Sequence, residues 1–125
     1  MIRSMLIVAL GGGIGSAFRF FVSKFVAENV GGTFPCPTFA VNIIGCLLIG
    51  LFYGLSARGS IGGDSMKLLL TTGLCGGFTT FSTFCNESLT LCRGDHALTA
   101  LLYAGCSAVV GFLAVAVGYC VAERV

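Results

Sequence analysis

The chain has 125 residues, of which 56% are hydrophobic and only 10% are charged, and its formal net charge is +2. Soluble domains carry roughly 25% charged residues, so this composition, with a mean hydropathy of +1.00, excludes a soluble domain and predicts an integral membrane protein. The small net charge gives no indication of nucleic-acid binding.

Four hydrophobic segments are each long enough to cross a bilayer as a helix. Only short segments join them, so we expect an all-α membrane domain over residues 1–125 in which neighbouring helices pack antiparallel. The first segment lacks a clear basic n-region and is treated as mature protein rather than a cleaved signal. The predicted spans are residues 2–26, 38–55, 65–92 and 97–122.

The first span contains small residues four apart, Gly11 with Gly15 and Gly12 with Ser16. This spacing predicts a face that packs closely against another helix. Arg19 is the one charge well inside the span, and two interpretations are open. Its guanidinium extends to the lipid headgroups, or it gives a water-filled mouth a positive potential that attracts anions.

The second span begins after Pro35 and Pro37, which favour a boundary, and carries Thr38 and Asn42 one helical turn apart. An asparagine in a membrane helix is costly unless it is hydrogen-bonded. Asn42 therefore either bonds across to another helix or offers its amide N–H groups to a ligand.

The third span has the least helical centre of the four, with glycines and a Thr-Thr pair where leucine and valine are usual. Each glycine costs about 1 kcal/mol relative to alanine in a helix. We predict a break over residues 76–80 near the membrane midplane, which requires burial in protein or an ion or water path. The alternative is a continuous helix with a glycine-rich packing face.

Polar and aromatic side chains follow the predicted break. Phe81 and Phe84 share a helix face, and either pack or turn their positive ring edges to an anion. Ser82 and Thr83 add hydroxyls, and Glu87 lies one turn beyond Thr83. Glu87 is open to interpretation as a proton site, an ion gate or a headgroup-level residue.

The fourth span carries a stripe of hydroxyls at intervals of four, Thr99, Tyr103 and Ser107. Together with the polar residues of spans two and three, these are neutral hydrogen-bond donors. Neutral donors suit a small anion that must bind and also leave.

The seven cysteines are odd in number, lack a C-x-x-C pair and mostly lie in hydrophobic runs. We interpret them as small packing residues rather than metal ligands or disulfides. No nucleophile–base pair is apparent, and the single His96 lies in a predicted loop, so we do not expect an enzyme.

An even number of spans places both termini on one side of the membrane. Orientation normally follows the excess of Lys and Arg on the cytoplasmic side, and here the two sides nearly balance. The balance predicts insertion both ways and an antiparallel homodimer; the alternative is a weak single orientation set by Arg58 and Lys67. The side of the membrane that carries both termini holds Arg3, Arg58, Lys67 and Arg124, and the opposite side holds Arg19, Lys24 and Arg93.

Three motifs in order closely resemble those of the Fluc (CrcB) fluoride channels, and the resemblance covers essentially the whole chain. They are Gly11-Gly12-Gly13-Ile14-Gly15 before Arg19, Val41-Asn42-Ile43-Ile44-Gly45, and Thr-Gly-Leu-Cys-Gly-Gly-Phe-Thr-Thr-Phe-Ser-Thr-Phe from Thr72 to Phe84. The third is long and highly specific. Cys85 and Phe20 depart from the family, which more often has Ser and Tyr there.

The resemblance implies a passive, fluoride-selective channel of the inner (plasma) membrane that exports cytoplasmic fluoride and gives fluoride resistance. It implies a dual-topology antiparallel homodimer with two pores and a structural sodium ion, held by the backbone carbonyls of Gly76 and Thr79 from both subunits. The implied fluoride pore is Asn42, Phe81, Ser82, Thr83, Phe84, Tyr103 and Ser107, and the implied pore mouth is Arg19, Thr38 and Glu87.

The main rival is a small multidrug antiporter of four helices. Those antiporters resemble this chain in size and dual topology, but depend on a carboxylate in the first helix and on tryptophan-rich cages. Here the first span has no acid before Glu28, and the chain has no tryptophan. A passive structural subunit of a larger complex, the third possibility, does not explain a break surrounded by hydroxyls.

Overall fold

The computed structural model describes all 125 residues and contains only helices and their connections. Four spans, Ile2–Asn29, Cys36–Ala57, Asp64–Arg93 and Ala97–Arg124, are long and apolar enough to cross a membrane, which confirms the four-span prediction. In chain order the elements are α1 (Ile2–Asn29), α2 (Cys36–Ala57), α3 (Asp64–Leu68), η1 (Leu69–Cys75), α4 (Gly76–Phe78), α5 (Phe81–Arg93) and α6 (Ala97–Arg124).

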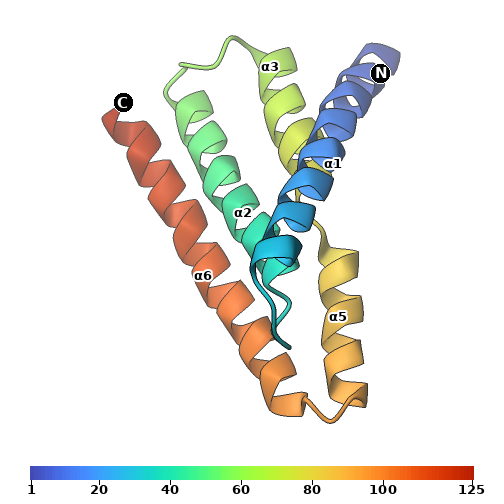
Figure 1. The fold of residues 1–125 in the computed structure, drawn as a ribbon. Helices are drawn as coiled ribbons and strands as arrows, with labels where there is room; N and C mark the ends of the chain where they lie inside the picture. The colour runs from blue at the N-terminus through green and yellow to red at the C-terminus, as the bar shows by residue number, and fades with distance from the viewer.

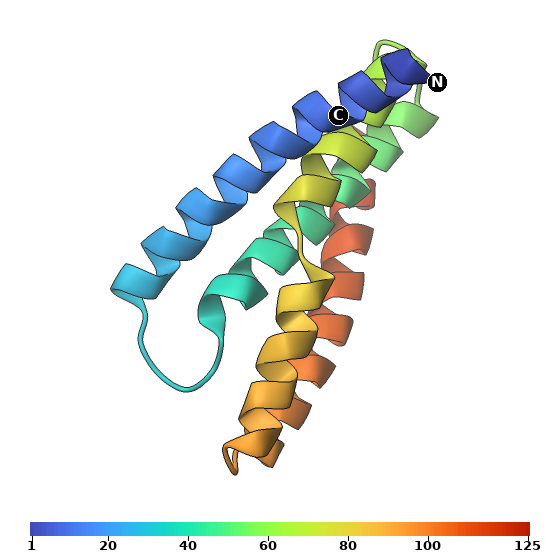
Figure 2. The ribbon, with the colours of Figure 1, turned by 90° about the vertical axis from the view of Figure 1, so that its right-hand side faces the viewer.

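The spans run up and down, so that both termini and the α2–α3 connection lie at one end (Figure 1). The α1–α2 and α5–α6 connections lie at the other end, as the side view also shows (Figure 2). The most extensive helix pair is α2 with α6, while α1 packs mainly on η1 and α4.

Glycines bring α2 and α6 into backbone contact. A Cβ atom on Gly50 would overlap the carbonyl oxygen of Val115, and one on Gly118 would overlap that of Leu47. Close backbone approach through small residues is a common way for helices to associate in lipid. The α2–α6 pair is therefore closely packed, and the third span lies against it.

The small-residue face of α1 packs on the third span. Gly11 and Gly15 are both buried. A Cβ on Gly11 would lie 2.6 Å from the carbonyl oxygen of Leu69, and one on Gly77 would lie 2.8 Å from the Cα of Gly12. The packing face predicted from these spacings is present, and its partner is the glycine-rich stretch of the third span.

The third span is interrupted over fewer residues than predicted. Only Thr79 and Thr80 leave the helix, with ψ angles of 162° and 120°; we call these two residues the interruption. Gly76 has helical dihedral angles, φ −62° and ψ −38°, so the predicted range of 76–80 is too wide. The reason is that Gly77 packs on Gly12 of α1, which keeps this part of the span helical, whereas the Thr80 N–H donates to Asn42 Oδ1 instead of to a helical carbonyl.

A π-helix, Leu69–Cys75, precedes the interruption and was not predicted, because no residue pattern marks the wider turn. Only 17 of 125 residues are buried in the single chain. Most apolar side chains therefore face outward, where lipid or a second protein surface would contact them.

Candidate ion-binding site

The side-chain amide of Asn42 pairs with the peptide of Thr80 at two points. Its Nδ2 donates to the Thr80 carbonyl oxygen at 3.0 Å, and its Oδ1 accepts from the Thr80 N–H at 2.8 Å. Of the two interpretations of Asn42, the bond to another span is thus present. One amide N–H of Asn42 is left over, because only one of its two Nδ2 protons is used.

The threonines of the interruption also bond locally. The N–H and the hydroxyl of Thr79 both donate to the Cys75 carbonyl, at 3.0 and 2.9 Å. Thr80 Oγ1 accepts from the Thr83 N–H at 3.3 Å and so caps the start of α5. The Thr79 carbonyl oxygen accepts no hydrogen bond from the chain.

A cavity of about 570 Å³ lies where α2, the third span and α6 meet. It collects residues far apart in the sequence, and its polar groups are neutral. Ser107 Oγ, on its wall, is buried and has no hydrogen-bond partner. Six residues predicted for the pore or the sodium site line it: Asn42, Gly76, Thr79, Phe81, Phe84 and Ser107.

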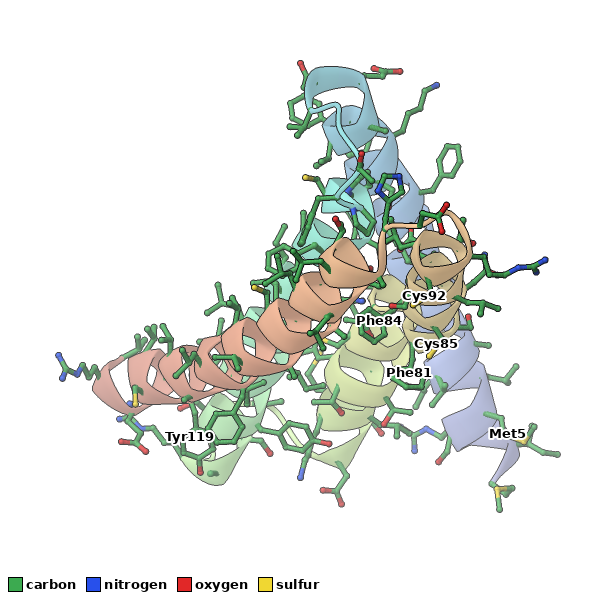
Figure 3. All side chains as sticks on the ribbon, turned by 90° about the horizontal axis from the view of Figure 1, so that it is seen from below. Met5, Phe81, Phe84, Cys85, Cys92 and Tyr119 are labelled. Carbon is green, nitrogen blue, oxygen red and sulfur yellow. The ribbon has the colours of Figure 1, made fainter.

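The two phenylalanines of α5 lie next to each other (Figure 3), with ring centroids 5.9 Å apart and planes inclined by 37°. They differ in their surroundings. Phe84 packs on Tyr103 at 4.9 Å, whereas Phe81 is 77% exposed. Phe81 therefore offers a ring to whatever covers this face of the chain.

Three predicted pore residues do not line the cavity. Ser82 is exposed, and Thr83 accepts a hydrogen bond from Thr80 Oγ1 at 3.1 Å. Tyr103 is fully buried and donates to Glu87 Oε1 at 2.9 Å, so its hydroxyl is engaged. The Thr38 hydroxyl donates to the other oxygen of Glu87 at 3.0 Å. Thr38, Glu87 and Tyr103 thus form one cluster beside the cavity.

Arg19, on α1, contacts the third span at α4. Its Nε donates to the carbonyl oxygen of Gly77 at 3.1 Å, and Ser16 Oγ donates to the same oxygen at 3.4 Å. The guanidinium is therefore held at the end of α4 and does not simply extend to the headgroups. It does not line the cavity either.

All seven cysteines are free thiols, and they differ in burial. Only Cys75 is buried, whereas Cys85, Cys92, Cys106 and Cys120 are exposed. A thiol is apolar enough to face lipid, so exposure in this chain carries little cost. Gly45 and Cys46 also lie on the cavity wall and were not among the predicted pore residues, although each lies within about one turn of Asn42.

A cation at the interruption would depend on backbone oxygens, because no group of three His, Cys, Asp or Glu residues could hold a metal. The unbonded Thr79 carbonyl suits a hard cation, which prefers oxygen ligands. Gly76 is exposed, and a Cβ there would meet nothing closer than Thr71 O at 3.9 Å. Gly76 and Thr79 both lie on the wall of the cavity.

The family model "CrcB-like protein, Camphor Resistance (CrcB)" matches residues 6–119 of the chain. The chain is similar to proteins named "Fluoride-specific ion channel FluC". The relative from Phocaeicola vulgatus is 46% identical over 121 residues, covering 97% of this chain and 99% of the relative. That from Flavobacterium psychrophilum is 41% identical over 122 residues, covering 98% of both. That from Methylobacillus flagellatus is 47% identical over 116 residues, covering 92% and 91%.

Proposed function

The chain belongs to the CrcB family, and we propose that it is a fluoride-specific, passive ion channel of the bacterial inner membrane. In this role it lets fluoride leave the cytoplasm and gives resistance to fluoride; it is not an enzyme. The observation that carries the proposal is the cavity, in which neutral donors and aromatic rings meet beside an interruption of a spanning helix.

The chemistry of the cavity suits fluoride. Fluoride is small and strongly hydrated, so a path must replace its water with hydrogen-bond donors. The unused N–H of Asn42 and the unpartnered hydroxyl of Ser107 are such donors. The ring edges of Phe81 and Phe84 add weak positive charge. Since no Lys or Arg lines the cavity, the anion is not trapped there.

We propose that two copies assemble antiparallel, with two pores and the interruption at the membrane midplane. The exposure of Phe81 and of polar Ser82 supports this, because polar groups at membrane depth need cover. Arg19 is bonded to Gly77 and is left out of the count of basic residues near the two membrane surfaces. The end with both termini then has four, Arg3, Arg58, Lys67 and Arg124, and the other end has two, Lys24 and Arg93. This bias is still small, as dual topology requires.

We further propose that a structural sodium ion binds the carbonyl oxygens of Gly76 and Thr79 from both copies. The Thr79 carbonyl oxygen has no hydrogen-bond partner within the chain. Lipid could not supply one, because its hydrocarbon core has no donors. When bound, the ion would satisfy these oxygens and join the two interruptions. The residues that hold it are neutral, so the charge near the pores would remain positive.

An efflux assay tests the function. Purified protein in liposomes loaded with potassium fluoride should release fluoride, recorded with a fluoride electrode, once valinomycin carries the potassium. Liposomes loaded with chloride should release almost none. Absence of fluoride efflux, or equal release of chloride, would contradict the proposal. Efflux that requires a proton gradient would instead indicate an antiporter.

A further inference from the structure

One face of α2 contacts both residues of the interruption. Asn42 pairs with the Thr80 peptide, and Gly45, three residues further along α2, faces Thr79. A Cβ atom on Gly45 would overlap the Cγ2 methyl of Thr79 and lie 3.4 Å from a ring carbon of Phe78. The absence of a side chain at Gly45 is therefore what lets the Thr79 methyl rest on α2.

Thr79 cannot easily turn its methyl away. Its hydroxyl donates to the Cys75 carbonyl at 2.9 Å, and its N–H donates to the same oxygen at 3.0 Å. A β-branched side chain has few χ1 positions, and another position would break the hydroxyl bond. The contact with Gly45 thus constrains the Thr79 backbone as well as its side chain.

We infer that Gly45 and Asn42 set the conformation of the interruption before any ion binds, and that Gly45 is a positioning residue for the Thr79 carbonyl oxygen. The effect of Gly45 on sodium binding rests on the sodium site proposed above. A site whose oxygens are already in place loses less conformational freedom when it binds. The contact of α2 with the interruption would then raise the affinity for sodium without touching the ion.

The test compares Gly45→Ala with Gly105→Ala. Gly105 is also in a spanning helix, but a Cβ there meets nothing within 4 Å. The unfolding temperature of each purified protein is measured while N-methylglucamine is replaced by sodium. Gly45→Ala should require roughly tenfold more sodium for the same stabilisation, as expected from overpacking. Gly105→Ala should respond as the unaltered protein does; an unshifted sodium response in Gly45→Ala overturns the positioning role.

A second substitution separates this contact from general damage. Thr79→Ser deletes the Cγ2 methyl and keeps the hydroxyl that bonds Cys75. The double variant Gly45→Ala/Thr79→Ser should therefore match Thr79→Ser alone in unfolding temperature and in sodium response. A double variant as impaired as Gly45→Ala would overturn the inference, because the methyl would not be the group that Gly45 accommodates.

Hydrogen exchange in sodium-free protein tests whether the interruption is preformed. The Thr80 amide should be protected there, since Asn42 accepts its proton; rapid exchange would overturn this part. If sodium stabilises no variant, the sodium site of the proposed function fails. Two measurements in sodium-free protein would still decide whether α2 sets the conformation of the interruption. These are the unfolding temperature of Gly45→Ala/Thr79→Ser against that of Thr79→Ser, and the protection of the Thr80 amide from exchange.

Discussion

The phenol of Tyr103 donates a hydrogen bond to Oε1 of Glu87 at 2.9 Å, across the contact between α6 and α5. Thr38 on α2 donates to Oε2 of the same carboxylate at 3.0 Å. Tyr103 is fully buried, with its ring 5.3 Å from that of Phe34 and 4.9 Å from that of Phe84. Two hydroxyls from two helices thus orient one carboxylate beside the proposed pore.

Tyr103→Phe should keep the ring packing and remove only this hydroxyl. We expect the free energy of unfolding to fall by about 1 kcal/mol, the usual size of a bond between membrane helices. Fluoride efflux should fall as well, because one hydrogen-bond donor then faces the negative charge of the Glu87 carboxylate instead of two.

Two further variants make this test specific. Glu87→Gln in the Tyr103→Phe background should restore efflux by removing the charge. Tyr53→Phe is the matched control, because Tyr53 is exposed. Its contact with Lys67 is made by the ring, which this substitution keeps: Lys67 Nζ lies 5.3 Å from the ring centroid. Equal efflux from Tyr103→Phe and the unaltered channel would exclude the cluster from conduction.

Phe81→Ile and Phe84→Ile should both reduce fluoride efflux while the dimer stays intact, since isoleucine has no polarised ring edge. Their stabilities should differ. Phe84 packs on Tyr103, whereas Phe81 is 77% exposed in the single chain, so Phe84→Ile should lower the unfolding temperature more than Phe81→Ile does. Efflux and thermal unfolding measured on the same preparations separate the two effects. Unchanged efflux in both variants would remove the ring edges from the mechanism.

The four spans could be predicted from sequence because lipid imposes a hydrophobic length that is visible in composition. The face of Gly11 and Gly15 was predictable for a similar reason, since a helical period fixes which residues share a side. The width of the interruption was not. Gly76 and Gly77 lower helix propensity, yet both lie in α4, where Gly77 packs on Gly12 of α1.

The site was predictable in part. Neutral donors in three spans indicated that they would meet, and Asn42 and Ser107 do line one cavity, together with the ring of Phe84. The engagement of Tyr103 by Glu87 was hidden, because no spacing relates residues on different helices. The contact of Arg19 with Gly77 was hidden for the same reason.

Gly76 and Gly77 are adjacent yet should respond differently to alanine. A Cβ on Gly77 would lie 2.8 Å from the Cα of Gly12, so Gly77→Ala should separate α1 from the third span and destabilise the chain by about 1–3 kcal/mol. A Cβ on Gly76 meets only Thr71 O, at 3.9 Å, so Gly76→Ala should fold. If a second copy covers Gly76, this variant should dimerise more weakly. Cross-linking in vesicles measures this, and a fully dimeric Gly76→Ala would argue against the proposed interface.

Asn42→Asp should abolish fluoride efflux. The carboxylate cannot donate to the Thr80 carbonyl oxygen, and it places negative charge on the cavity wall. Asn29→Asp is the control, because Asn29 is exposed at the end of α1 and bonds only Phe25 O of its own helix. The electrode assay compares the two in parallel. Normal efflux through Asn42→Asp would show that the anion does not pass this cavity.

The balance between insertion orientations should respond to the basic residues at the terminal end. The end with both termini has four basic residues and the other end has two. Replacing Arg58 and Lys67 together by glutamine leaves two at each end, so the ratio of orientations should shift. Arg58 also donates to the Ala122 and Glu123 carbonyls, at 2.9 and 3.2 Å, and so helps to end α6. Its loss should therefore cost stability as well.

Lys67→Gln alone separates the two effects, since it removes one charge and leaves the bonds of Arg58 intact. Reporter domains that are active on only one side of the membrane, fused to the C-terminus, measure the ratio. Each charge removed should move the ratio in the same direction, with the double variant moving furthest. A ratio that stays constant through both variants would mean that packing, rather than charge, selects the orientation.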